Sequence, residues 1–242
     1  MATKPAAVVA RTLSEQVFDA LQTAIVSGDL KPGEKIREPE LARRFGTSRG
    51  PLRDALRRLE ARHLVINRPN SGARVVSLSP GKLVELYEVR EALEGMTCRL
   101  AAEPLRDEEI AELGALLDRH EAELGTGDGA VYFQQEGDLD FHYRIADACG
   151  NELLRSALCE DHYQLMRLYR YKFANRAGRA HRALAEHRQI HEAIRARDSE
   201  HAELLMRRHI RNARLAFQRH LAAEAERADG AIESNGNETE AT

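Results

Sequence analysis

The chain has 242 residues, 43% of them hydrophobic and 31% charged, with a net charge of −3, which suits one large or two modest soluble domains. Its three cysteines, at positions 98, 149 and 159, form no CxxC pair, which argues against a disulfide framework or a thiolate zinc site and leaves buried or inert thiols. No apolar run approaches the ~20 residues of a membrane span, and the N-terminus has no signal-peptide pattern, so we expect a cytoplasmic protein without a membrane partner.

The first third of the chain predicts a helix, a short helix, a third helix and a β-hairpin. LSEQVFDALQTAIVSG repeats apolar residues at i+4 and ends at Gly28, and PELARRF forms a second helix. FGTSRGPLRDALRRLE continues as a helix to about residue 63, and LVINRPNSGARVVSL places turn chemistry between two β-branched runs. This order is that of a winged helix-turn-helix domain, which we assign to residues 1–78.

Charge is divided unevenly along the chain. Residues 1–78 hold 14 basic and 8 acidic residues, a net charge of +6, which leaves −9 for the remainder. A basic N-terminal part on an acidic body indicates a polyanionic partner for the first part only.

Pro51 lies inside the third predicted helix, where an interior proline would cost ~3 kcal/mol. The cost disappears if Thr47 or Ser48 is the N-cap, because the first turn has no intrahelical hydrogen bonds to lose. Arg49 and Arg53 then lie near the helix N-terminus, one turn apart, where a recognition helix meets base edges. Thr47, Ser48 and the free N–H groups suit phosphates. Alternatively, the arginines of this region form only a solvated basic face.

The rest of the chain predicts a mainly α protein. Gly- and Pro-containing breaks separate six candidate helices of an antiparallel bundle, which we assign to a second domain, residues 79–226. The polar residues 227–242 predict a disordered tail. The expected helices span about 80–101, 106–124, 129–148, 151–173, 179–197 and 199–226.

Histidine spacing in this second domain suggests a metal site. Asp138 and His142 are four residues apart on one predicted helix, and His187 and His191 share a helix face in the same way. His209 lies on the apolar stripe of the last helix. A bundle could bring Asp138, His142, His187 and His209 around one cavity, as a ligand set for zinc, nickel, manganese or iron(II). Each histidine, taken alone, is more often a packed or exposed helix residue than a metal ligand.

The segment PELARRFGTSRGPLRDALRRLEARHLV resembles the DNA-binding signature of the GntR family of bacterial transcription regulators. The resemblance spans residues 11–76. It implies that Arg49 and Arg53 read an operator, with Arg43 in the same basic surface, and that Gly72 lets the wing tip approach the minor groove. Gly50 stands where the family usually has threonine, which removes an expected phosphate contact.

Residues 80–222 resemble the helical ligand-binding (FCD) domain of the FadR-type subgroup, through YEVREALEG, DLDFH, AEHRQIHEAI and MRRHI. This resemblance implies that Asp138, His142, His187 and His209 are the ligands of a metal, most often zinc, and that His191 either holds a ligand in place or is structural. Six helices point to the vanillate-regulator-like branch. Members sense small carboxylic acids, and Arg90 is the candidate effector-binding arginine, unless it only pairs with Glu94 at i+4.

We therefore expect a homodimeric, metal-containing regulator, most often a repressor in this family. Two recognition helices about one DNA turn apart would bind a pseudo-palindromic operator in double-stranded DNA of the bacterial nucleoid. A small carboxylate effector would change the affinity for that operator. Two other classes stay open at this point: a metal-dependent enzyme fused to a DNA-binding module, against which no further catalytic residues are found, and a constitutive architectural DNA-binding protein.

Overall fold

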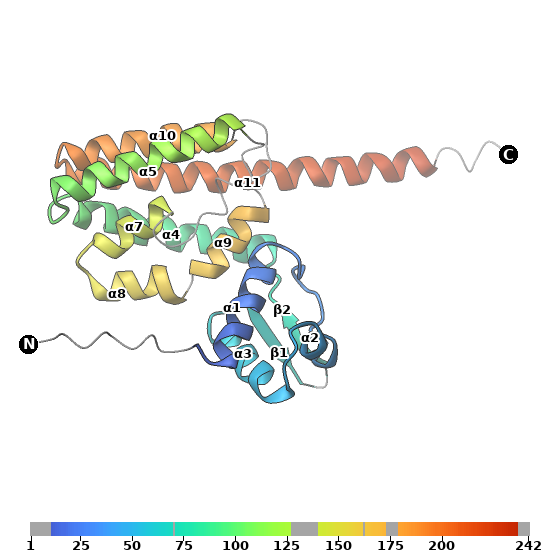
Figure 1. Ribbon diagram of the computed structural model, residues 1–242. Helices are drawn as coiled ribbons and strands as arrows, with labels where there is room; N and C mark the ends of the chain where they lie inside the picture. The colour runs from blue at the N-terminus through green and yellow to red at the C-terminus, as the bar shows by residue number, and fades with distance from the viewer. Residues whose placement is uncertain (1–10, 70, 127–139, 162, 173–178, 237–242) are drawn as a thin grey trace, which may run out of the picture. The chain divides into compact units, whose positions relative to one another are not determined.

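A computed structural model describes residues 11–69, 71–126, 140–161, 163–172 and 179–236 of the protein (Figure 1). The chain divides into two compact units. The first comprises Met1–Ser77 with Glu160–Lys172, and the second comprises Leu78–Cys159 with Phe173–Thr242. The predicted fold class, mainly α with one small hairpin, is confirmed.

The first unit has the predicted element order: helices α1, α2 and α3, then strands β1 and β2. Thr12 caps α1 through a capping box with Glu15, and the buried stripe of α1 includes Leu21 and Ile25. The two strands pair antiparallel in the register Val65↔Val75. The elements span Leu13–Val26, Glu38–Arg44, Arg49–Ala61, Val65–Arg68 and Gly72–Val75, and α9 (Tyr163–Lys172) is grouped with them.

Helix α3 begins as its sequence predicts. Ser48 is the N-cap, with extended backbone angles of −83° and 172°, so Arg49 is the first helical residue and Pro51 the third. Proline there costs no intrahelical hydrogen bond. Arg58 and Arg62, near the C-terminal end of α3, are not fully solvated. Their guanidinium groups lie 4.2 and 5.1 Å from the ring centroid of Phe18.

The second unit is a bundle of long helices with short ones packed beside them (Figure 1). Its first and last helices, α4 and α11, run antiparallel, because ion pairs join Arg99 to Glu203, Glu91 to Arg211 and Glu88 to Arg214 in reversed order. The helices are α4 (Pro80–Ala101), α5 (Asp107–Thr126), α7 (Phe141–Ala148), α8 (Glu152–Arg155), α10 (Arg179–Arg195) and α11 (Ser199–Gly236).

Helix boundaries differ from the prediction in three places. The helix predicted at 129–148 is described only from Phe141, because residues 127–139 lie outside the described residues. The helix predicted at 151–173 is divided into α8, a π-helical turn at Ser156–Asp161 and α9. A π-turn accommodates an extra residue, which a search for a 3.6-residue period does not detect. Finally, α11 continues past residue 226 to Gly236, into the segment predicted to be a disordered tail. Residues 227–236, RADGAIESNG, include two glycines and few strong helix formers, so local propensity does not explain the extension.

Candidate functional site

Three histidine rings meet inside the second unit. His142 lies in the first turn of α7, His187 in the middle of α10 and His209 in α11. Nε2 of His187 lies 3.1 Å from Nε2 of His142 and 3.2 Å from Nε2 of His209. His187 and His209 are buried and His142 is half-buried. Three of the four predicted ligands therefore come together from three separate helices.

Two glutamates fix the orientation of the outer rings. Oε2 of Glu94, on α4, lies 2.6 Å from Nδ1 of His142, and Oε2 of Glu186, on α10, lies 2.6 Å from Nδ1 of His209. An Nδ1–H that donates to a carboxylate leaves the Nε2 lone pair free, and this arrangement is the usual support of a metal-binding histidine. Both free Nε2 atoms therefore face His187.

The distances from Nε2 of His187 to the other two Nε2 atoms suit a shared divalent cation. At a zinc–nitrogen bond length of about 2.0–2.1 Å, tetrahedral angles separate two nitrogen ligands by ~3.3 Å and octahedral angles by ~2.9 Å. The distances of 3.1 and 3.2 Å lie between these values. A single proton on His187 can satisfy one of its two contacts fully, whereas a cation satisfies all three lone pairs at once.

The fourth predicted ligand, Asp138, lies outside the described residues. Asp140, two positions later, is buried and caps α7. Its Oδ1 accepts hydrogen bonds from the backbone N–H groups of His142, at 2.9 Å, and Tyr143, at 3.4 Å. This cap fixes the first turn of α7 and with it the backbone that carries His142.

Burial sets the protonation states around the three rings. It holds the pKa of His187 well below the ordinary value, with a further contribution from His209 and His142. Burial also lowers the pKa of His209, to about 4, although its hydrogen bond to Glu186 opposes the change. Burial of Glu186 is outweighed by the hydrogen bond and charge of His209, so its pKa falls to about 2. At neutral pH His187 and His209 are therefore neutral imidazoles, the form that binds metal, beside the ionised carboxylate of Glu186.

Stability of the chelator-treated protein should therefore fall as pH falls. His209 has a folded-state pKa of about 4, below the ~6.5 of an unfolded histidine. Between these values the unfolded chain binds a proton that the folded chain does not, so acidification favours unfolding. Glu186 adds a further loss of stability at lower pH, because its pKa falls from an ordinary value of 4.5 to about 2 in the folded chain. Urea unfolding at pH 7.5, 6 and 5 measures the effect; an unfolding free energy that stays constant over this range would contradict it.

Arg90, the predicted effector-binding residue, lies in the same network. It is buried, its Nε donates to Oε1 of Glu94 at 2.7 Å, and its guanidinium lies 5.3 Å from the ring centroid of Tyr87. The i+4 pairing with Glu94, one of the two alternatives for Arg90, is thus present. Burial opposes ionisation of Glu94, but the charges of Arg90 and His142 hold its pKa far below the ordinary value.

His191 is separate from the three-histidine cluster. Its Nε2 donates to the backbone oxygen of Ile110 at 2.9 Å, and its ring lies where a side chain on Gly114 would stand. It holds α10 against α5 and is a structural residue.

The helix-turn-helix places the predicted DNA-binding residues at one end of α3. Arg49 and Ser48 are exposed, and the described residues offer Arg49 no ion pair. Nε of Arg53 donates to Oε2 of Glu38, on α2, at 2.9 Å. The Thr47 hydroxyl is buried and, within the described part of the chain, has no hydrogen-bond partner.

The remaining predicted contacts lie on α2 and the wing. Arg43 is exposed and donates from Nε to the backbone oxygen of Pro39 at 3.3 Å. Gly72 opens β2 with a positive φ of 79°, which glycine adopts without strain. A Cβ at Gly72 would meet nothing within 4 Å, so the positive φ is what favours glycine there.

Comparison with known families agrees with the predicted family resemblance. Residues 13–75 match the bacterial regulatory proteins of the gntR family, and residues 85–212 match the FCD domain. The chain belongs to the GntR family. Both family matches follow the predicted resemblance, the first over the helix-turn-helix and the second over the helices that carry the three histidines.

Relatives of this GntR protein include regulators from several bacteria. An HTH-type regulator of Bacillus subtilis, YdhC, is 31% identical over 192 residues, covering 78% of this chain and 83% of the relative. The Escherichia coli repressor GlaR is 32% identical and covers 78% and 89%. A probable D-xylose utilization operon repressor of Paenarthrobacter nicotinovorans is 32% identical and covers 82% and 86%. The chain is therefore a DNA-binding transcription regulator and not an enzyme.

A solved structure confirms the fold of this GntR regulator. Escherichia coli McbR/YncC aligns with a TM-score of 0.68 at 23% identity, over 87% of this chain and all of that chain. Within the described parts of the regulator, no helix has the length and apolarity needed to cross a membrane.

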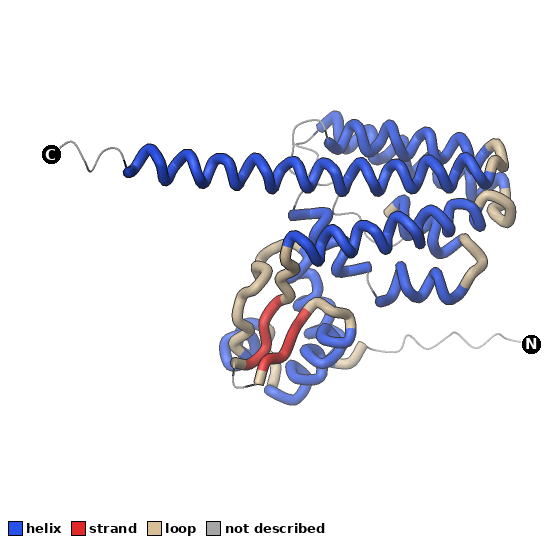
Figure 2. Tube along the Cα trace, turned by 180° about the vertical axis from the view of Figure 1, so that it is seen from behind, coloured by secondary structure: helices blue, strands red, loops and turns tan. Residues whose placement is uncertain are grey.

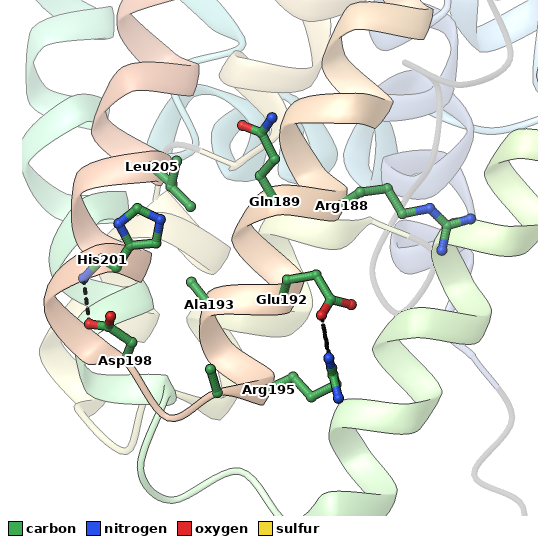
Figure 3. A pocket seen from close by; sticks show the side chains of 9 residues that line it. Arg188, Gln189, Glu192, Ala193, Arg195, Asp198, His201 and Leu205 are labelled. Carbon is green, nitrogen blue, oxygen red and sulfur yellow. Dashed lines mark hydrogen bonds and ion pairs between the residues drawn. The ribbon is translucent and has the colours of Figure 1, made fainter.

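A surface hollow of about 550 Å³ lies where α10 turns into α11 (Figure 3). Its arginines already have carboxylate partners: Arg195 pairs with Glu192, and Arg188 pairs with Asp118 and Glu121 of α5. Asp198 is engaged by the backbone of His201. Both arginines that line the hollow are therefore already neutralised by carboxylates of the described residues.

Replacing Gly50 by threonine should strengthen operator binding by this regulator. Gly50 is the second residue of α3, and a Cβ there would meet nothing within 4 Å. The hydroxyl restores the family's expected phosphate contact, and a net hydrogen bond of ~0.5–1.5 kcal/mol corresponds to a gain of roughly 2- to 12-fold. Gly50→Ala is the matched control for helix propensity, so equal affinities of the two variants in fluorescence anisotropy would eliminate the contact.

Proposed function

We propose that this regulator is a metal-containing repressor that releases operator DNA when a small carboxylate binds to its helical domain. The convergence of three imidazole rings, each outer ring oriented by its own glutamate, carries the proposal. Residues 1–78 would bind DNA, and residues 79–226 would hold the metal and the effector. Since the partner is chromosomal DNA, we place its action at the bacterial nucleoid.

His142, His187 and His209 would hold the cation, with Asp138 as a fourth protein ligand. Zinc suits this donor set best, and nickel, manganese or iron(II) also accept it. The cation supplies positive charge and open coordination positions to a carboxylate. Arg90 would assist from α4: its Nε is engaged by Glu94, so its terminal Nη groups are the ones that can meet the effector.

Helix α4 can transmit effector binding to the DNA-binding unit. It carries Arg90 and Glu94, and Glu94 holds the ring of His142. It also begins at Pro80, only five positions after the last residue of the wing, Val75. An effector that binds one conformation of α4 more tightly than another would shift the protein toward that conformation. If the two conformations differ in their affinity for DNA, this shift is sufficient for allosteric release.

Operator binding would need two copies of the chain. In a homodimer the two α3 helices enter major grooves about one turn apart on a pseudo-palindromic site. Arg49 and Arg53 would read bases, and Arg43, Ser48 and the Gly72 wing would position the domain on the backbone. The Thr47 hydroxyl is buried, so Thr47 would contact a phosphate only if its side chain turned outward.

The decisive experiment follows operator binding by fluorescence anisotropy during titration with candidate effectors, before and after chelation. The panel holds hydroxy acids, sugar acids and aromatic acids, and uncharged D-xylose, the sugar named for one relative's operon. Release by a carboxylate that depends on metal supports the proposal. Consumption of the ligand would instead indicate catalysis. Indifference to every ligand and to chelation would indicate an architectural DNA-binding protein.

A further inference from the structure

A second buried arginine, Arg179, lies beside the three-histidine cluster. It is only 9% exposed and is the first residue of α10, the helix that carries Glu186 and His187. Burial is the main cause of the lowered pKa of His187 and of His209, and the charge of Arg179 contributes to both, so its guanidinium is near both rings. Arg179 therefore belongs to the interior of the helical domain, together with the histidines.

Glu186 is the carboxylate partner of Arg179, but it is already well supplied with hydrogen bonds. Its Oε2 lies 2.6 Å from Nδ1 of His209, and its Oε1 accepts a hydrogen bond from Nδ2 of Asn212 at 2.8 Å. Nη1 of Arg179 shares Oε2 at 3.2 Å, the longest of the three contacts. Glu186 is the one carboxylate that the described residues offer to Arg179. A guanidinium has five N–H donors in a fixed fork, so most donors of this buried cation stay available to another anion.

The other glutamate of the site shows what a purely supporting arginine does. Each oxygen of Glu94 has one partner: Oε1 accepts from Nε of Arg90 at 2.7 Å, and Oε2 lies 2.6 Å from Nδ1 of His142. On Glu186 the place that Arg90 takes on Glu94 is filled by the amide of Asn212. Arg179 is therefore not needed to complete the second glutamate, and its burial calls for another explanation.

Arg179 and Arg90 lie on the same side of the histidine cluster. Helix α11 lies beside α4 (Figure 2), and both α4 and α10 run antiparallel to it, as the order of their contacts with α11 shows. Arg90 precedes Glu94 by four residues of α4, and Arg179 precedes His187 by eight residues of α10. At 1.5 Å per residue, these are displacements of about 6 and 12 Å in one direction along the bundle. Two cationic groups thus follow each other on one side of the metal centre.

We propose that Arg179 binds a second carboxylate of the effector, which makes the effector a small dicarboxylic acid. One carboxylate meets the cation and the Nη groups of Arg90, and the other meets the fork of Arg179. The assignment rests on the carboxylate effector of the proposed function and names the class of acid. A planar guanidinium binds a carboxylate through two parallel hydrogen bonds, a geometry that a hydroxyl group does not offer.

Dicarboxylates and their monoamides test the assignment. Succinate, glutarate and adipate differ in length, and the monoamide of each lacks one charge at nearly the same shape. Isothermal titration calorimetry of the zinc-loaded full-length chain, without DNA, should show at least one dicarboxylate that binds roughly tenfold or more tightly than its monoamide. This ratio is the one expected of a hydrogen-bonded charge pair.

Substitution of Arg179 should remove this difference. Arg179→Gln should lower the affinity for the dicarboxylate to that for the monoamide and leave the monoamide nearly unaffected. Arg179→Lys keeps the charge without the fork and should retain only part of the difference. Arg90→Gln should weaken both acids, because both place a carboxylate at the cation. Arg182→Gln, at an exposed position of α10, is the matched control for the loss of one positive charge and should change neither affinity.

Metal analysis separates effector binding from support of the metal centre. Arg179→Gln should keep its zinc, because Glu186 retains Asn212 and His209 as partners. A variant that loses zinc and binds both acids equally weakly would assign Arg179 to the metal centre and overturn the proposal.

The remaining outcomes distinguish this inference from the proposed function. A wild-type chain that binds each dicarboxylate and its monoamide equally well overturns the second carboxylate site and leaves a monocarboxylate effector in place. A zinc-loaded chain that binds none of the acids, here or in the operator titration, overturns both. A dicarboxylate that requires Arg179 for binding but does not release operator DNA upholds the inference and sinks only the proposed release mechanism.

Discussion

His187→Ala is expected to abolish stoichiometric metal binding and to lower the melting temperature of the metal-loaded protein on the order of 10 °C. Nε2 of His187 lies 3.1 Å from Nε2 of His142 and 3.2 Å from Nε2 of His209. Removing the His187 ring therefore takes away the central one of the three histidine ligands. A ligand present at a thousand times its dissociation constant stabilises the folded state by about 4 kcal/mol. Metal analysis of the purified variant and calorimetry measure the two effects.

Chelation separates the metal contribution from simple packing. The ring of His187 stacks on Phe141 with centroids 4.4 Å apart, so its truncation also leaves a cavity that destabilises the protein without metal. The difference in melting temperature between wild type and variant should therefore shrink after chelation without vanishing. His181→Ala, at an exposed position of the same helix, is the matched control. Full metal occupancy in His187→Ala would refute the site, as would a difference that chelation leaves unchanged.

The sequence predicts the histidines of the metal centre but not the residues that orient them. His142, His187 and His209 can be selected by spacing, helix face and family resemblance, all of which are properties of single segments. Glu94 acts on a ring from another helix, and Glu186 acts on a ring of α11 from α10, so both roles depend on helix packing. The adjacency of Glu186 to His187 is the one local signal that could have identified it.

The same distinction applies to the fold. The start of α3 at Ser48–Arg49 follows from local chemistry, because Pro51 is tolerated only in a first turn. The π-turn at Ser156–Asp161 has no such local signature and divides a helix predicted as continuous. The role of Glu94 and the crossing of Arg207 over Gly95 appear only once α4 is packed against α7 and α11.

Arg49→Ala and Arg53→Ala should each weaken operator binding by ~1–3 kcal/mol and relax the preference for operator over random DNA. Both arginines lie in the first two turns of α3, the end that enters the major groove in a helix-turn-helix. Competition anisotropy with operator and scrambled duplexes at fixed salt measures the two affinities. An equal loss on both duplexes would reduce the residue to a phosphate contact.

Glu38 sharpens the prediction for Arg53. Its carboxylate accepts a hydrogen bond from Nε of Arg53, so it restrains the guanidinium while leaving the terminal Nη groups for a guanine edge. It also places a negative charge beside the DNA-binding surface, which weakens binding to any sequence. Glu38→Gln should therefore raise the affinity for random DNA and lower the ratio of operator to random affinity. A uniform gain on both duplexes would mean that Glu38 contributes only charge and that Arg53 is oriented by the DNA itself.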